Sequence, residues 1–69
     1  MRITVIGGSG ATGSAVVAEA ARRGHTVTSV TRSGRHVEGA AADVIAELAD
    51  AAAVELINDS DATIIAISP

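Results

Sequence analysis

The stretch that decides the fold is residues 3–17, which read Ile3-Thr4-Val5-Ile6-Gly7-Gly8-Ser9-Gly10-Ala11-Thr12-Gly13-Ser14-Ala15-Val16-Val17. Its first four residues are β-branched and stop at Gly7, a pattern typical of a strand buried on both faces of a parallel sheet. Small residues then form a loop over 7–13, and helical spacing follows from about Ala11 to Arg23. The order of strand, glycine-rich turn and helix predicts a βαβ unit.

Further elements can be placed outward from this stretch. Gly24 stands where a glycine would end the helix, and residues 25–30 alternate polar and apolar side chains as a second strand does. Residues 31–42 carry two glycines and mixed charges, which predicts a surface loop. A polar turn at 58–61 precedes a strong strand prediction over Ala62–Ile67. Within the helix, Glu19 lies three and four residues before two arginines, a spacing typical of a solvated face.

The segment Asp43–Ile57 has two interpretations. Taken alone, it resembles one amphipathic helix capped by Asp43. Alternatively, a short third strand covers about Val44–Leu48, and Asp50 caps a helix over Ala51–Ile57. We favour the second interpretation because a third strand is expected beside the second.

The spacing Gly7-x-x-Gly10-x-x-Gly13 between a strand and a helix predicts a dinucleotide site. The first glycine permits a tight turn, the second lets a diphosphate approach the backbone, and the third lets helix and strand pack closely. The amides at the helix N-terminus can bind the diphosphate without a lysine, and Ser9 and Thr12 are placed to contact it. The competing interpretation is a tight turn that binds no ligand.

The end of the second strand bears on which dinucleotide would bind. Sites that prefer NAD usually place an acidic residue there for the ribose 2′-hydroxyl. This chain has Arg32, 19 residues after Gly13, followed by Ser33. A guanidinium can hold a 2′-phosphate with two hydrogen bonds, so the sequence favours NADP over NAD. The alternative is that Arg32 is an ordinary solvated loop cation, which is also our interpretation of Arg35.

Composition excludes several classes of function. The chain has 69 residues and a formal net charge of −3, with no cysteine and no aromatic residue. Disulfide scaffolds and thiolate metal sites are therefore excluded, and a nucleic-acid partner is not expected. No lysine or tyrosine is present to serve as a catalytic group, and we expect no metal site. With no apolar stretch long enough to span a bilayer and no signal peptide, we expect no membrane partner and a cytoplasmic protein.

Residues 4–17, 21–28 and 31–32 resemble the N-terminal half of atypical short-chain dehydrogenases/reductases, in particular NAD(P)H-binding NmrA-like proteins and biliverdin/flavin reductases. Residues 61–69 are similar to that family's fourth strand, which reaches the ribose and nicotinamide side of the cofactor. Together with the spacing above, the resemblance implies a set of cofactor-binding residues, namely Gly7, Ser9, Gly10, Ala11, Thr12, Gly13, Arg32, Ser33, Glu47, Leu48, Ala66 and Ile67. For the adenine contact after the third strand, either Glu47-Leu48 or Asp43-Val44 fills the family's position.

The resemblance also sets expectations for the whole molecule. It implies an α/β, Rossmann-like three-layer fold with a parallel sheet, of which residues 1–69 form an N-terminal β-α-β-(β)-α-β portion of one domain and a fragment of a longer chain. The implied function is an NAD(P)H-dependent oxidoreductase acting on a flavin, quinone or similar small molecule, in which an oligomer is possible. The alternative is a non-catalytic NAD(P)-sensing NmrA-like regulator. A less favoured third class is a dihydrodipicolinate reductase or an aspartate-semialdehyde dehydrogenase.

Overall fold

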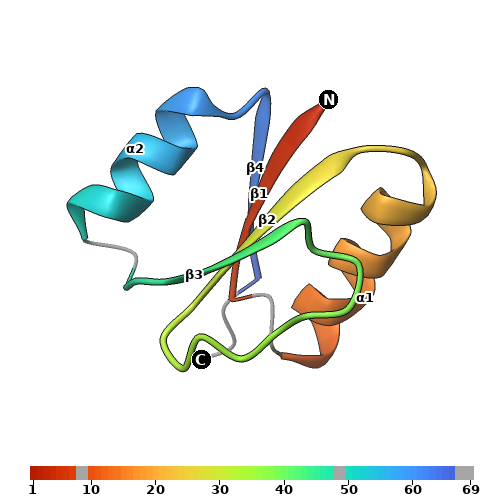
Figure 1. The fold of residues 1–69 in the computed structure, drawn as a ribbon, viewed down its shortest axis with the longest axis horizontal. Helices are drawn as coiled ribbons and strands as arrows, with labels where there is room; N and C mark the ends of the chain where they lie inside the picture. Colours follow the sequence, from red (N-terminus) through yellow and green to blue (C-terminus); the bar gives the residue numbers. More distant parts are fainter. Residues whose placement is uncertain (8–9, 48–49, 67–69) are drawn as a thin grey trace.

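Four parallel strands form one sheet in the order β3-β2-β1-β4 (Figure 1). The computed structural model describes residues 1–7, 10–47 and 50–66. In chain order the elements are β1 (Arg2–Ile6), α1 (Ala11–Arg22), β2 (Thr26–Thr31), β3 (Ala42–Ile45), α2 (Ala51–Asp59) and β4 (Ala62–Ile65). The predicted parallel α/β architecture is therefore confirmed.

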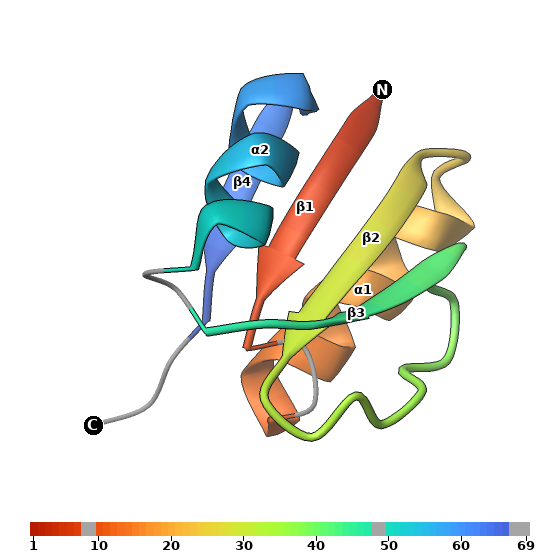
Figure 2. The same ribbon diagram turned by 60° about the vertical axis from the view of Figure 1, so that its left-hand side comes forward.

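The two helices cover opposite faces of the sheet, which gives three layers (Figures 1 and 2). One buried cluster joins α1 to one face of β1 and β2 and contains Ile3, Val5, Val17, Ala20, Val27 and Val37. A second cluster lies on the other face, where Ala53 of α2 packs with Ile6 and Val30. Successive side chains of β1 thus point into different cores, as expected for a central strand that is buried on both sides.

Gly24 ends α1 as predicted. Its φ of +87° lies in the left-handed region that glycine adopts without steric cost. The Gly24 amide donates to the Ala21 carbonyl at 3.0 Å, and the His25 amide donates to the Ala20 carbonyl at 3.1 Å. This pair of hydrogen bonds is the Schellman motif, which satisfies carbonyls that the helix would otherwise leave without partners.

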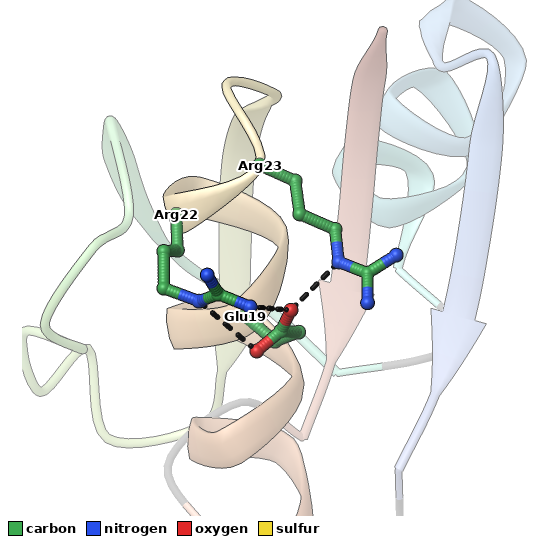
Figure 3. A network of polar contacts seen from close by, with 3 residues as sticks. All are labelled: Glu19, Arg22 and Arg23. Atoms are coloured by element: carbon green, nitrogen blue, oxygen red, sulfur yellow. Dashed lines mark hydrogen bonds and ion pairs between the residues drawn. The ribbon is translucent and has the colours of Figure 1, made fainter.

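The solvent-facing side of α1 carries the predicted charge cluster. Arg22 Nη2 and Arg23 Nε each lie 2.6 Å from Glu19 Oε2 (Figure 3). Hydrogen bonds from Arg22 first, and then from Arg23, lower the pKa of the Glu19 carboxyl. All three side chains are well exposed, so water and salt screen the ion pairs and the cluster serves mainly to solvate this face.

The segment Asp43–Ile57 is a strand followed by a helix, as the favoured interpretation expected, but the boundaries differ. β3 begins at Ala42, because Ala42 pairs with Thr28 of β2, and it ends at Ile45. Asp50 holds the N-cap position of α2 without a side-chain capping bond; its Oδ2 instead accepts the Glu47 amide at 2.8 Å. Residue 47 therefore belongs to the turn after β3, and the predicted strand over Val44–Leu48 was placed too late in the chain.

Two other predicted boundaries are also wrong by a few residues. The polar turn predicted at 58–61 is shorter, because α2 continues to Asp59 before the chain turns at Ser60. The Ser60 hydroxyl donates to the Leu56 carbonyl at 2.6 Å and also contacts the hydroxyl of buried Thr4 in β1. β4 ends at Ile65, so Ala66 follows the strand, and Ile67 lies outside the described residues.

The connection between β2 and β3, residues 32–41, runs beside α1 without forming a helix (Figures 1 and 2). Its Val37 is buried in the α1-side core. Asp43 of β3 anchors the connection: Oδ1 accepts the Val37 amide at 3.0 Å, and Oδ2 lies 2.6 Å from His36 Nδ1. These hydrogen bonds, that of His36 being the stronger cause, lower the pKa of the Asp43 carboxyl.

Replacing Gly24 by alanine should destabilise the protein through backbone strain alone. Among the described residues other than its two chain neighbours, no atom lies within 4 Å of a Cβ built at Gly24, so the positive φ is the cost, about 1 kcal/mol of unfolding free energy. Urea unfolding of the two proteins measures this difference. Gly24→Asn is the matched control and should lose less, because asparagine tolerates the left-handed region; an equal loss in both variants would contradict this explanation.

The Asp43 carboxylate should make stability depend on pH in the acid range. Because its pKa is lower in the folded state than in the unfolded state, it stabilises the fold above the ordinary carboxyl range, and this contribution is lost as pH falls through the folded-state pKa. Asp43→Asn should therefore be less stable at neutral pH, and its urea midpoint should fall less steeply below about pH 4. Glu19→Gln should leave the Asp43 contribution in place. Identical acid profiles for wild type and Asp43→Asn would refute the assignment.

Candidate functional site

The predicted site residues that the structure describes all lie at the carboxyl edge of the sheet or follow it directly. Gly7 follows β1, Arg32 follows β2, and Ala66 follows β4. Because the strands are parallel, these ends meet at one edge, opposite the chain's N-terminus (Figure 2). Three predicted site residues, Ser9, Leu48 and Ile67, lie outside the described residues.

The carboxyl ends of β1 and β4 flank a topological switch point. From β1 the chain crosses through α1 to β2 on one side, whereas α2 brings it to β4 on the other side and on the other face of the sheet. Connections that leave a sheet in opposite directions open a crevice between them, and open α/β sheets bind their ligands there. The glycine turn lies at this point.

Gly7 makes the turn that leaves β1. Its φ is +86°, which favours glycine, and its amide donates to the Val30 carbonyl of β2 at 2.8 Å. Its own carbonyl accepts the Gly10 amide at 3.3 Å. The first glycine of the motif therefore has the conformational role that the spacing predicted.

Among the described residues, no side chain caps the N-terminus of α1. Gly10 holds the N-cap position with no side-chain capping bond, and the first turn of the helix has no acidic residue. The first turn of a helix leaves its amides without intrahelical partners, and here the Ser14 amide closes the first helical bond, to the Gly10 carbonyl at 2.8 Å. Ala11 and Thr12 at this end are exposed, whereas Gly13 is buried. Such a helix end combines free amide donors with a partial positive charge.

Among the described residues, nothing in the backbone conformation or the surroundings of Gly10 requires a glycine. Its φ of −75° suits any residue, and a Cβ placed on it would lie 3.7 Å from the Gly7 carbonyl oxygen, an ordinary van der Waals contact. Its exposed backbone leaves room for a ligand to approach where a side chain would otherwise stand. The site thus fits a diphosphate lying across the glycine turn.

Arg32 and Ser33 directly follow β2 at the carboxyl edge of the sheet. The Thr31 hydroxyl is buried and accepts the Gly34 amide at 2.9 Å, which fixes the turn. The Arg32 side chain is exposed, and within the described ranges no hydrogen bond or ion pair engages it. Ser33 Oγ accepts the Arg35 amide at 3.3 Å, so its hydroxyl proton is still available to another acceptor.

Of the two alternatives for the adenine position, the structure places only Glu47 at the edge. Glu47 is exposed in the turn after β3 and its amide is held by Asp50. Asp43 lies within β3, paired in register with Ser29, and its carboxylate already binds His36 and the Val37 amide.

At the end of β4, the Ala66 amide donates to the Ile6 carbonyl at 2.8 Å. This bond extends the pairing of β4 and β1 by one residue beyond the strand. It holds Ala66 beside the glycine turn, on the far side of β1 from Arg32.

Sequence reasoning did not anticipate the contacts of His36 and Asp43. His36 is exposed, and no residue next to it in sequence indicates that Asp43 is its partner. The pattern Thr31-x-x-Gly34 is the one local signal that could have indicated the turn after β2, since a threonine hydroxyl often accepts an amide a few residues on.

In the ranges 1–7, 10–47 and 50–66, no group of three or more histidine, aspartate or glutamate side chains gathers in a metal-binding arrangement. No helix in these ranges is both long enough and apolar enough to cross a membrane.

Comparison with known proteins agrees with this geometry. The family model described as "NAD dependent epimerase/dehydratase family" matches residues 3–67, which include the glycine turn, β2, β3, β4 and all of β1 except Arg2. No curated protein and no solved structure gives a significant match. The chain belongs to the NAD dependent epimerase/dehydratase family, a family of NAD(P)-binding enzymes with a Rossmann-like fold.

Proposed function

We propose that this chain holds NAD(P)H across the carboxyl edge of its sheet as the cofactor-binding part of an oxidoreductase. The observation that carries the proposal is the open N-terminus of α1 behind Gly10, located at the switch point between β1 and β4. When bound, the nicotinamide supplies the hydride chemistry. The residues of this chain bind and orient the dinucleotide.

Each part of the dinucleotide would contact a different set of residues. The diphosphate would be held by Gly7, Ser9, Gly10, Ala11 and Thr12, with Gly13 allowing close packing of α1 on the sheet. The adenosine half would lie toward the ends of β2 and β3, against Arg32, Ser33, Glu47 and Leu48. The nicotinamide half would lie toward the end of β4, near Ala66 and Ile67.

The preference for NADP over NAD rests on Arg32. Its guanidinium is exposed at the end of β2 and has no acidic partner among the described residues, so it remains available to a phosphate. Glu47 does not serve as an acidic residue at the end of β2, because it follows β3, where its amide donates to the Asp50 carboxylate. An adenosine 2′-phosphate would gain two charge-assisted hydrogen bonds from the arginine, which a 2′-hydroxyl cannot accept to the same degree.

A reductase and a sensor differ in what happens to the NADPH that they bind. The resemblance to biliverdin/flavin reductases supports a reductase of a flavin, a quinone or a similar small molecule, and the resemblance to NmrA-like proteins supports a sensor. Loss of NADPH absorbance in the presence of a flavin or quinone separates the two. A reductase transfers the hydride, whereas a sensor binds NADPH and leaves it reduced.

The Arg32→Ala variant should lose the preference for NADPH. Calorimetric titration should give wild-type binding of NADPH about tenfold tighter than of NADH, a difference of about 1.4 kcal/mol. The variant should bind both cofactors with the affinity that wild type has for NADH. Arg22→Ala, which removes the same charge from the far face of α1, is the control and should keep the preference. If Arg32→Ala keeps it as well, the phosphate-binding role is wrong.

The Gly10→Ser variant should separate binding from folding. Serine is a good N-cap, so the unfolding free energy should stay the same or rise slightly, while the new side chain blocks the approach to the helix amides. Affinity for both cofactors should fall about tenfold or more. Gly24→Ala is the reciprocal control, because it should lower stability and spare affinity. Unchanged affinity in Gly10→Ser would overturn the diphosphate site.

A further inference from the structure

The segment that carries Arg32 has no regular secondary structure, so its conformation depends on a few specific contacts. Residues 32–41 connect β2 to β3, and Arg32 stands at their beginning. An arginine can discriminate between cofactors only if its backbone is held in one place relative to the ribose. The contacts that fix this segment are therefore candidates for determinants of specificity. This inference rests on the proposed function.

Both ends of the segment are fixed by local contacts and core packing. At the start, the Thr31 hydroxyl holds the Gly34 amide, and a Cβ on Gly34 would overlap the Ile45 side chain of β3. At the far end, a Cβ on Gly39 would lie 3.1 Å from the Ala21 Cβ of α1. Val37 is 4% exposed, between these two anchors.

Asp43 provides the polar anchor in the middle. One carboxylate oxygen accepts the Val37 amide, and the other binds the His36 ring nitrogen. The Asp43 side chain is 19% exposed, whereas that of His36 is 68% exposed, so the histidine is held over the carboxylate from the solvent side. The contact spans β3 and residues 36–37, and it closes the loop that begins at Arg32.

The contact between His36 and Asp43 also affects the negative charge of the Asp43 carboxylate. Asp43 is the acidic residue on β3, the strand next to the end of β2. With His36 and an amide bound to it, its charge is partly compensated. It therefore holds the segment while opposing little of the attraction between Arg32 and a phosphate.

We propose that Asp43, acting through His36 and the Val37 amide, is a positioning residue that sets the selectivity of the site for a 2′-phosphorylated dinucleotide. It touches neither cofactor. It holds the segment that presents Arg32 and Ser33, so its loss should weaken binding of the phosphorylated cofactor and leave the remainder of the dinucleotide site intact.

Two substitutions test this proposal in the full chain. In Asp43→Asn, the amide oxygen can still accept the Val37 amide, but the charge that holds His36 is removed. His36→Ala removes the same contact from an exposed position that does not threaten the core. In each variant, the ratio of NADPH to NADH affinity should fall about fivefold, NADH affinity should stay within about twofold, and the double variant should show no further fall.

Two controls separate this effect from general destabilisation. Ser29 pairs in register with Asp43, and its buried hydroxyl has no hydrogen-bond partner among the described residues. Ser29→Ala should therefore leave the affinity ratio unchanged although it alters the neighbouring position. Glu19→Gln removes a carboxylate bound to two arginines on the outer face of α1, and it should also keep the ratio.

The outcomes distinguish this inference from the proposed function. An equal fall in NADPH and NADH affinity in Asp43→Asn and His36→Ala would make the role merely structural and overturn the inference. A wild-type ratio in both variants, with the ratio lost in Arg32→Ala, would overturn it while the proposed function stands. If wild type itself has no preference for NADPH, or binds neither cofactor, the proposed function fails first and the inference fails with it.

Discussion

The end of β1 is the point on which the rest of the structure depends. On one side the Gly7 amide donates to Val30 of β2, and on the other the Ile6 carbonyl accepts the Ala66 amide, both at 2.8 Å. The strand is thus held between two neighbours up to its last residue. The connection to α1 begins at Gly7, whose positive φ is a conformation that glycine adopts without steric cost. Sheet pairing and helix direction together set the location of the crevice.

The core is small and divided because β1 is a central strand with a layer on each face. With both faces of β1 covered, the chain divides its apolar residues between two clusters, neither of which contains an aromatic side chain. Valine, isoleucine and alanine fill the space between a helix and a sheet at close range, and β-branched side chains suit the strands. Polar contacts, such as those of Ser60 with Thr4 and of Asp43 with the Val37 amide, then add to the anchoring of the connections.

Local sequence patterns predicted the first strand, the first helix and the end of that helix. The β-branched run before Gly7, the helical spacing after Gly10 and the stop at Gly24 each reflect the conformational preference of the residues concerned, and the structure has them where expected. The bounds of β3 could not be found in this way. Ala42 is in the strand because it pairs with Thr28 of β2, a contact that its neighbours in sequence do not encode. The Asp50 carboxylate, three residues away, binds the Glu47 amide after the strand has ended.

In the candidate site, too, some features could be predicted from local sequence and others depend on contacts between distant residues. The glycines, Arg32 and Ala66 lie at one edge because the strands are parallel, which the βαβ pattern predicts. Whether the loop after β2 has a fixed shape depends on His36 meeting Asp43 seven residues away, and on Val37 filling a gap beside α1. No local pattern encodes a side-chain contact across a connection of this kind, so the anchor appears only in three dimensions.

The pairing of β4 with β1 has a consequence for the order of folding. Arg2 and Asp61 are hydrogen-bonded across 59 residues of sequence, whereas β1, α1 and β2 meet within about half that distance. Closing the longer loop costs more chain entropy, by about 0.6 kcal/mol for a doubling of loop length, which favours docking of β4 after the first βαβ unit has formed. The switch point beside Gly7 is therefore complete only once this last strand is in place. A dinucleotide bound there stabilises the completed fold by mass action and slows its unfolding, without acting as a template for the earlier steps.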